Sequence, residues 1–178
     1  MAGKADMYGV KMIVEYDGTN YAGFQRQPSR PTIQGELEKA LSIILREEIK
    51  VVGAGRTDAG VHALHQVVSF KTGASFEADR LQWSLNCLSP KDIAVKRIEI
   101  VDSSFCARRS ATSREYEYFI LNRSHPSPFL DRYSHFVARR LDLKAMREAA
   151  KFLVGTHDFF AFCPTCGGDP TRPETSSR

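Results

Sequence analysis

The stretch that most constrains the fold is a glycine-rich loop between two strand-like runs, VGAGRTDAGVHALHQVVSF, at residues 52–70. Gly53, Gly55 and Gly60 fall within this loop, together with one arginine and one aspartate. The apolar run that follows, at residues 65–70, has the composition typical of a strand. Such a loop serves as a phosphate cradle, a tight turn or a platform for a reactive carboxylate.

Two nucleotide-binding motifs fail on residues that they require. The dinucleotide fingerprint is G-x-G-x-x-G, whereas the spacing here is Gly53-x-Gly55-x-x-x-x-Gly60. A Walker A loop requires lysine and then serine or threonine after its second glycine. Val61 and His62 stand at those two positions. A tight turn and a carboxylate platform therefore remain as the two hypotheses.

The carboxylate hypothesis rests on Arg56 and Asp58, which lie two residues apart. In an extended loop both side chains would face one cleft and could pair, and a nearby guanidinium keeps a carboxylate ionised. An ionised, positioned carboxylate acts as a nucleophile or a base. Glycine and aspartate are also ordinary turn residues, so a purely structural turn stays open. His62 and His65 fit turn and strand-edge positions better than metal ligation, because no acidic or cysteine cluster accompanies them.

The first hundred residues alternate strand and helix patterns. Thr32 can cap a helix that follows Pro31, and residues 77–88 form a second amphipathic pattern. Strands are predicted at residues 10–18, 49–55, 65–70 and 92–101. The inward positions of the two helices are Ile33, Leu37, Leu41 and Ile44, and Leu81, Leu85 and Leu88. The order β-α-β-β-α-β is the ferredoxin-like arrangement, so we expect an α+β fold.

A second unit begins near residue 105 and has about half as many elements. A strand is predicted at residues 113–121, a short one at 133–137, and a helix at 142–155 with Gly155 at its C-cap. The strand would place Tyr116, Tyr118 and Ile120 on one face, and the helix stripe would be Leu143, Met146, Ala150 and Leu153. We therefore expect two domains, residues 1–104 and an incomplete α+β domain at residues 105–178.

Composition narrows the function classes. The 178 residues are 42% hydrophobic, enough for a packed core, and the net charge of +4 fits either a polyanionic partner or an ordinary surface. Cys163 and Cys166 form a lone C-x-x-C pair, which lacks the further ligands that zinc requires. Because the chain has no apolar run of about 20 residues and no signal-peptide pattern, we expect no membrane span and a cytoplasmic protein.

Several ordered motifs resemble one family. GAGRTDAGVHALHQVVSF is similar to the signature of the TruA-type tRNA pseudouridine synthases. Further stretches resemble other blocks of that family in the same order: EYDGTNYAGFQRQ, TIQGELEKAL, LNCLSPKDIAV, SFCARRSATSREYEYFI and LVGTHDFFAFC. The resemblance spans about residues 10–163 and identifies the chain as a member of this family. It implies a pseudouridine synthase fold whose second domain is incomplete here.

The resemblance also implies a reaction and its residues. The family isomerises uridine to pseudouridine in the anticodon stem-loop, at tRNA positions 38 to 40, without a cofactor or metal. By position, Asp58 matches the essential aspartate, which is the nucleophile. Arg56 matches the arginine that helps to flip the base, and Tyr116 the tyrosine that stacks on the target uracil. The family works on tRNA as a homodimer in the cytoplasm. The arginines that flank the motifs are predicted to contact phosphates: Arg26, Arg30, Arg108, Arg109 and Arg114.

Two departures from the family pattern affect these expectations. Cys106 stands where the family usually has histidine, a change that we expect to be tolerated. The family also continues beyond the position of Arg178, through an RTI motif and a GNGFLYxMVR-like motif that adds another active-site arginine. We therefore expect a truncated synthase. Two alternatives are open: the 178-residue chain keeps its activity without the missing part, or it is inactive without it.

Two other functions are open from sequence. The first is a ferredoxin-like RNA-binding module without activity; a pure binder has no need of Asp58, so that residue discriminates. The second is a carboxylate-dependent glycosidase, which normally needs a pair of carboxylates, whereas the loop offers one acid.

Overall fold

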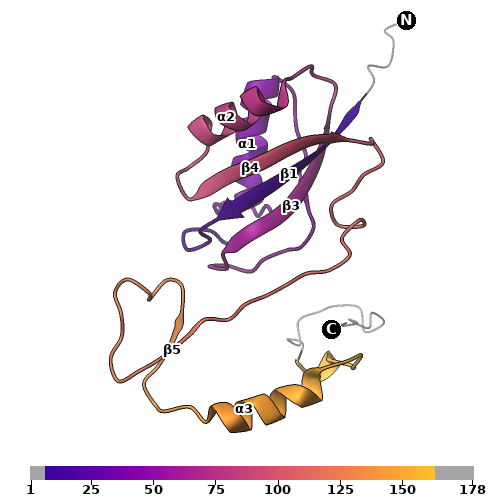
Figure 1. The fold of residues 1–178 in the computed structure, drawn as a ribbon. Helices are drawn as coiled ribbons and strands as arrows, with labels where there is room; N and C mark the ends of the chain where they lie inside the picture. Colours follow the sequence, from indigo (N-terminus) through magenta and orange to yellow (C-terminus); the bar gives the residue numbers. More distant parts are fainter. Residues whose placement is uncertain (1–6, 163–178) are drawn as a thin grey trace, which may run out of the picture. The chain divides into compact units, whose positions relative to one another are not determined.

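The structure, a computed structural model, describes residues 7–162. The chain divides into two compact units, Met1–Tyr116 and Glu117–Arg178. The first unit has mixed α/β structure, with a four-stranded sheet in the order β2-β3-β1-β4 and antiparallel pairing throughout (Figure 1). In chain order its elements are β1 (Tyr8–Tyr16), α1 (Ile33–Leu45), β2 (Val52–Gly53), β3 (Ala63–Thr72), α2 (Ala78–Leu88) and β4 (Ile93–Val101).

The core of the first unit forms where the two helices pack against the sheet. Alternate residues of β1 are buried because successive side chains of a strand point to opposite faces; these are Val10, Met12, Val14 and Tyr16. The helices bury Ile33, Leu37, Leu41, Leu81 and Leu85 in the same cluster. Most of the predicted inward positions are therefore confirmed. Leu88 is 45% exposed, because α2 ends there and the chain turns towards β4.

Both helices of the first unit begin at a side-chain cap. The Thr32 hydroxyl accepts the Gly35 N–H at 3.2 Å, so the predicted cap of α1 is confirmed. The Glu77 carboxylate accepts the Asp79 and Arg80 N–H groups at 3.0 and 2.8 Å. These bonds satisfy donors that a helix leaves without intrahelical partners at its start.

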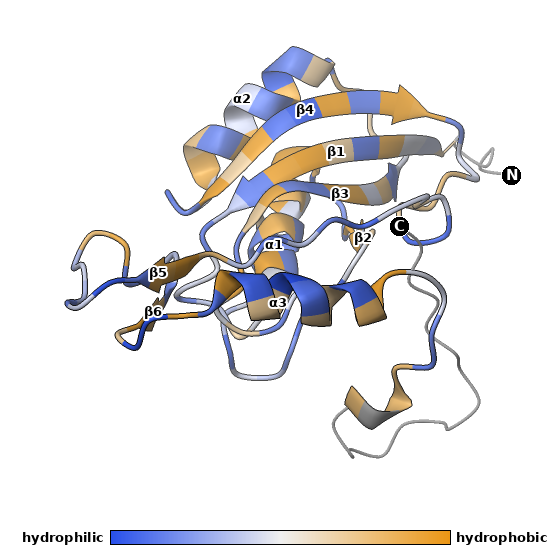
Figure 2. Cartoon of the chain, turned by 60° about the horizontal axis from the view of Figure 1, so that its bottom comes forward, coloured by the Kyte–Doolittle hydropathy of each residue, from blue (hydrophilic) through white to orange (hydrophobic). Residues whose placement is uncertain are grey.

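The second unit contains short elements. A two-stranded parallel sheet joins β5 (Ile120–Asn122) to β6 (His135–Val137), and α3 (Leu143–Ala150) follows. The 3₁₀ turns are Lys151–Leu153 and Phe160–Phe162. Figure 2 shows hydrophobic and hydrophilic residues interleaved along α3, and none of the residues of α3 is buried.

Two predictions for this second region are wrong. Residues 113–119 form no strand, so the alternation of Tyr116, Tyr118 and Ile120 is not a sufficient signal. A strand also needs a paired strand beside it, and in the described residues the pairing with β6 begins at Ile120. The predicted helix ends early, at Ala150, and tightens into a 3₁₀ turn. Gly155 is therefore not the C-cap of α3, although its φ of +114° is one that glycine favours.

The described residues include no helix that is both long and apolar enough to cross a membrane.

Candidate active site

The glycine loop, residues 54–62, joins β2 to β3 and carries Asp58 on its exposed side. The Val61 N–H donates to the Asp58 carbonyl oxygen at 3.2 Å, which closes a tight turn. Gly60 completes this turn with a φ of +78°, a conformation that costs glycine little. The loop is thus a turn and also a platform for a carboxylate, so the two hypotheses left open by the sequence are compatible.

A second loop, residues 17–27, lies against the glycine loop and is called here the brace loop. The Phe24 N–H donates to the Thr57 carbonyl oxygen at 3.0 Å, and the Gly60 N–H donates to the Tyr21 carbonyl oxygen at 3.3 Å. Gly23 has a φ of +101°, and a Cβ there would lie 2.6 Å from the Thr57 carbonyl oxygen. Backbone hydrogen bonds therefore fix the chain on both sides of Asp58.

The brace loop is itself anchored to the start of β4. The Tyr21 hydroxyl donates to the Asp92 carboxylate, and the Asp17 N–H donates to the Asp92 carbonyl oxygen at 2.9 Å. Burial raises the pKa of Tyr21, and its hydrogen bond to Asp92 raises it further. The neutral phenol therefore remains a donor to Asp92 across the physiological pH range.

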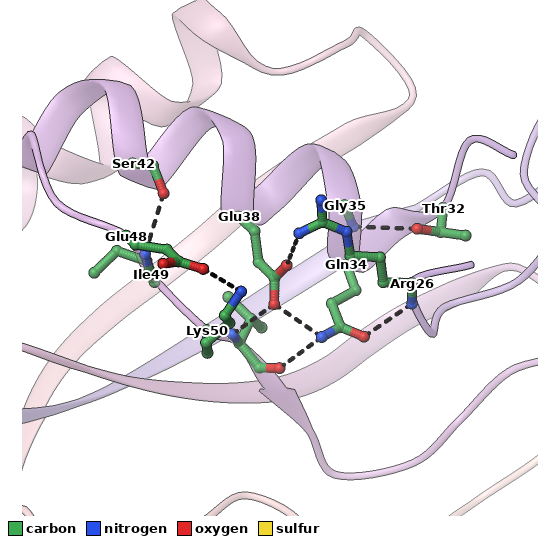
Figure 3. A network of polar contacts seen from close by, with 10 residues as sticks. Arg26, Thr32, Gln34, Gly35, Glu38, Ser42, Glu48, Ile49 and Lys50 are labelled. Atoms are coloured by element: carbon green, nitrogen blue, oxygen red, sulfur yellow. Dashed lines mark hydrogen bonds and ion pairs between the residues drawn. The ribbon is translucent and has the colours of Figure 1, made fainter. Parts of the chain in front are cut away.

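A buried carboxylate holds the chain that enters β2 (Figure 3). The side chain of Glu38 is 5% exposed and forms an ion pair with Arg26 at 3.2 Å. Its Oε1 accepts the Val51 N–H at 3.0 Å and the Gln34 Nε2–H at 2.8 Å. Gln34 also accepts the Arg26 N–H at 3.0 Å. The network thus joins α1, the brace loop and the residue that precedes β2.

The structure brings Arg114 and Tyr116 to the start of the glycine loop. The Nε and Nη2 groups of Arg114 donate to the Ala54 carbonyl oxygen at 3.1 and 2.6 Å. A Cβ on Gly55 would lie 3.4 Å from Arg114 Nε and 3.7 Å from the Tyr116 hydroxyl oxygen. Tyr116 belongs to the same unit as Asp58. It is 61% exposed, so its ring is accessible to a ligand.

Arg56 and Asp58 are both exposed, and within residues 7–162 no ion pair joins them. The pairing that the sequence left open is therefore not made in this structure. Thr57 between them contacts Tyr16 through its side chain, and a shared cleft for Arg56 and Asp58 stays a prediction.

Arg108 and Arg109 are exposed in the turn that follows β4. Their contacts with phosphate stay predictions.

Cys106 stands where histidine was expected. A hydrogen bond from the backbone N–H of Arg109 lowers the pKa of its thiol.

Three further residues of the site were missed by the sequence reasoning: Tyr16, Thr57 and Gln66. The Tyr16 hydroxyl lies 2.8 Å from Thr57 Oγ1, and Gln66 Nε2 donates to the Gly55 carbonyl oxygen at 2.8 Å. The signal for Tyr16 was its inward position at the end of β1, because a buried tyrosine hydroxyl usually has a hydrogen-bond partner.

Among residues 7–162, no three histidine, cysteine, aspartate or glutamate side chains gather where they could hold a metal ion. Cys163 and Cys166 lie outside the described residues.

Sequence comparison shows the family to which this chain is similar. A family model described as tRNA pseudouridine synthase matches residues 12–109. A protein named tRNA pseudouridine synthase A from Bacillus subtilis (strain 168) is 48% identical over 156 residues, which are 86% of this chain and 63% of that protein. Proteins with the same name from Chlorobium luteolum and Dictyoglomus thermophilum are 50% and 46% identical; the matches cover 88% and 94% of this chain, and 61% and 69% of those proteins.

The chain belongs to the tRNA pseudouridine synthase family. It spans about 63% of the length of the Bacillus subtilis relative.

Proposed function

We propose that the protein is an isomerase that converts uridine to pseudouridine in tRNA, with Asp58 as the nucleophile. The observation that carries this proposal is the exposed Asp58 on a loop that hydrogen bonds hold at Thr57 and Gly60. A fixed carboxylate avoids reorganisation during the reaction, which is a large part of electrostatic catalysis. Family membership, with relatives named tRNA pseudouridine synthase A, supports the same reaction.

In the proposed reaction, the glycosidic N1–C1′ bond breaks, the uracil turns, and its C5 atom bonds to C1′. The reaction is an isomerisation with no net oxidation and no transfer to another molecule, so it needs no cofactor. Asp58 attacks either the uracil ring or the ribose and forms a covalent bond. That bond breaks again once C5 is joined to C1′, the proton on C5 is lost and N1 gains a proton, so the product is an isomer of the substrate.

Arg56 and Tyr116 are proposed to hold the target base outside its helix. Extrusion of a base costs a few kcal/mol, and stacking on an aromatic ring recovers roughly 1–3 kcal/mol. The exposure of Tyr116 and the position of its hydroxyl near Gly55 support its role as the stacking partner. Exposed Arg56 would fill the space that the base leaves.

The proposed substrate is the anticodon stem-loop, at tRNA positions 38 to 40. A groove of about 540 Å³ is lined by Arg26, Arg30, Lys39 and Lys50, and also by Glu36, Glu38 and Glu48. Arg26 pairs with Glu38 and Lys50 with Glu48, so Arg30 and Lys39 are the groove residues proposed first as phosphate contacts, and Arg26 is proposed as a weaker one. Arg108 and Arg109 are exposed and are proposed as further phosphate contacts. We assign Arg114 a lesser part in phosphate binding, because its guanidinium already donates to Ala54.

The finer fold assignment belongs to the same proposal. The element order and the sheet order β2-β3-β1-β4 support a ferredoxin-like arrangement of the first unit. The family resemblance further suggests a homodimer that acts in the cytoplasm, where its tRNA substrate is found. Size-exclusion chromatography with light scattering would test the dimer.

The decisive test is a pseudouridine assay on an anticodon stem-loop transcript. Because the chain spans 63% of the Bacillus subtilis relative, the assay should use two proteins. One is the 178-residue chain, and the other continues past Arg178 with the remainder of that relative. Each is compared with its Asp58→Asn variant, which keeps the size of the side chain, and with Asp79→Asn as a control on the exposed side of α2.

We expect pseudouridine from at least the longer protein, a loss of at least a thousandfold in Asp58→Asn, and no change in Asp79→Asn. Product from Asp58→Asn at the parent rate would contradict the nucleophile assignment. RNA binding by both proteins without any product would favour the RNA-binding module.

A further inference from the structure

We infer that Tyr16 is a positioning residue for the isomerisation proposed above: its hydroxyl fixes Thr57 and thereby the direction of the Asp58 carboxylate. The inference rests on the proposed function for its catalytic meaning. The contact itself is a feature of the first unit and can be measured separately.

Tyr16 is placed rigidly. It is the last residue of β1 and is 4% exposed. Its ring lies 6.3 Å from that of Phe24 in the brace loop, in a tilted arrangement. The pairing of β1 with β3 becomes irregular between Val14 and Tyr16, and irregularities of this kind re-aim a side chain at the end of a strand. The phenol therefore has one well-defined direction.

That direction leads to the residue before Asp58. The Tyr16 hydroxyl oxygen lies 2.8 Å from Thr57 Oγ1, while the Thr57 carbonyl oxygen accepts the Phe24 N–H at 3.0 Å. Thr57 is thus held through its side chain and its backbone. Within residues 7–162 the Asp58 carboxylate forms no hydrogen bond or ion pair, so its direction depends on these contacts of Thr57 and on the turn that Gly60 completes.

The same hydroxyl lies among other groups of the site. Burial raises the pKa of Tyr16, hydrogen bonds with Thr57 and Gln66 oppose this, and Tyr116 raises it slightly. Gln66 in turn donates to the Gly55 carbonyl oxygen at 2.8 Å, next to the Tyr116 hydroxyl. The buried phenol of Tyr16 is therefore linked to the Asp58 turn through Thr57 and to Gly55 through Gln66.

The first test separates kcat from KM in the active protein of the pseudouridine assay. Tyr16→Phe removes the hydroxyl without leaving a cavity, and Thr57→Val removes its partner. We expect kcat to fall about tenfold to a hundredfold in each, because small misplacements of a reacting group cost that much, while KM for the RNA stays within twofold. The double variant should lose little more than either single variant.

Tyr8→Phe is the matched control, because Tyr8 begins the same strand and is 44% exposed. It should leave kcat and KM unchanged. An unchanged kcat in Tyr16→Phe, or a loss equal to that of Tyr8→Phe, would overturn the inference.

The second test uses amide hydrogen exchange in the 178-residue chain and needs no activity. Loosening of Thr57 in Tyr16→Phe should speed exchange of the Phe24 amide by about fivefold. This is the change in the local opening equilibrium that loss of one hydrogen bond, about 1 kcal/mol, produces. The Ala54 amide, which donates to Val67 at 2.8 Å, should keep its rate. Equal rates at Phe24 would overturn the inference, whereas a faster Phe24 amide in a protein without activity would place the failure in the proposed function.

Discussion

The two units of the chain differ in what holds their apolar side chains. In the described part of the first unit, some twenty hydrophobic residues form one buried cluster between the sheet and the two helices. In the described part of the second unit, Ser127 is the buried residue, and every large apolar side chain is partly or largely exposed. Tyr118 is 93% exposed and Phe129 87%.

The difference shows that apolar residues at helical spacing are buried in one helix and exposed in another. The apolar stripes of α1 and α3 are similar in kind, since both follow helical spacing. The stripe of α1 is buried, whereas Leu143 and Met146 of α3 are 58% and 42% exposed. Burial, not the stripe, supplies the stability, so we expect the first unit to carry nearly all the unfolding free energy of the chain.

The sharpest test compares two methionines. Met12 is fully buried in β1, and Met146 lies on α3. We expect Met12→Ala to lower the unfolding free energy by about 2–5 kcal/mol, through lost burial and a residual cavity, and Met146→Ala to change it by less than about 0.5 kcal/mol. Urea unfolding followed by circular dichroism measures both. Similar losses would mean that the second unit is also packed.

Two glutamates extend the comparison to ion pairs. Glu38 is buried and accepts the Val51 N–H, whereas Glu148 forms an exposed pair with Lys151 at 2.8 Å. We expect Glu38→Ala to cost about 1–3 kcal/mol, since it leaves a buried donor without its partner. Glu148→Ala should cost less than about 1 kcal/mol. Thermal unfolding at low and high salt checks this, because the exposed Glu148–Lys151 pair should weaken with salt more than the contacts of buried Glu38.

Helix caps give a smaller effect. Thr32→Ala removes the cap of α1, and we expect a loss of about 1 kcal/mol in unfolding free energy. Asp142 caps α3 through the Lys144 and Ala145 N–H groups, each at 3.0 Å. Asp142→Ala should reduce the helical chemical shifts of residues 143–150 and leave the main unfolding transition in place. A shift of that transition would show that α3 contributes to the core.

The smallest effect is expected from removal of the second unit. A fragment of residues 1–116 keeps every residue of the buried cluster, so its unfolding midpoint in urea should lie close to that of the full chain. The full chain, unfolded under the same conditions, is the reference. A fragment that fails to fold would contradict the division at Tyr116.

Sequence reasoning was most successful where burial and local chemistry agree. The strands and helices of the first unit, the Thr32 cap and the glycine loop follow from periodicity and turn residues, and all are present, although the strand predicted at residues 49–55 is reduced to Val52–Gly53. The second region shows the limit, because alternation at residues 113–119 cannot supply a strand with a neighbour. The structure added Tyr16, whose importance depends on contact with Thr57, 41 residues away in the chain. Local patterns do not encode such distances.

The backbone bonds between the brace loop and the glycine loop also limit how this fold can be re-engineered. Phe24 and Gly60 each donate to the opposite loop, and Gly23 leaves no room for a side chain beside Thr57. An insertion in either segment would shift the register of the other. We therefore expect the Asp58 turn to keep its conformation in another protein only if residues 17–27 are transferred together with it.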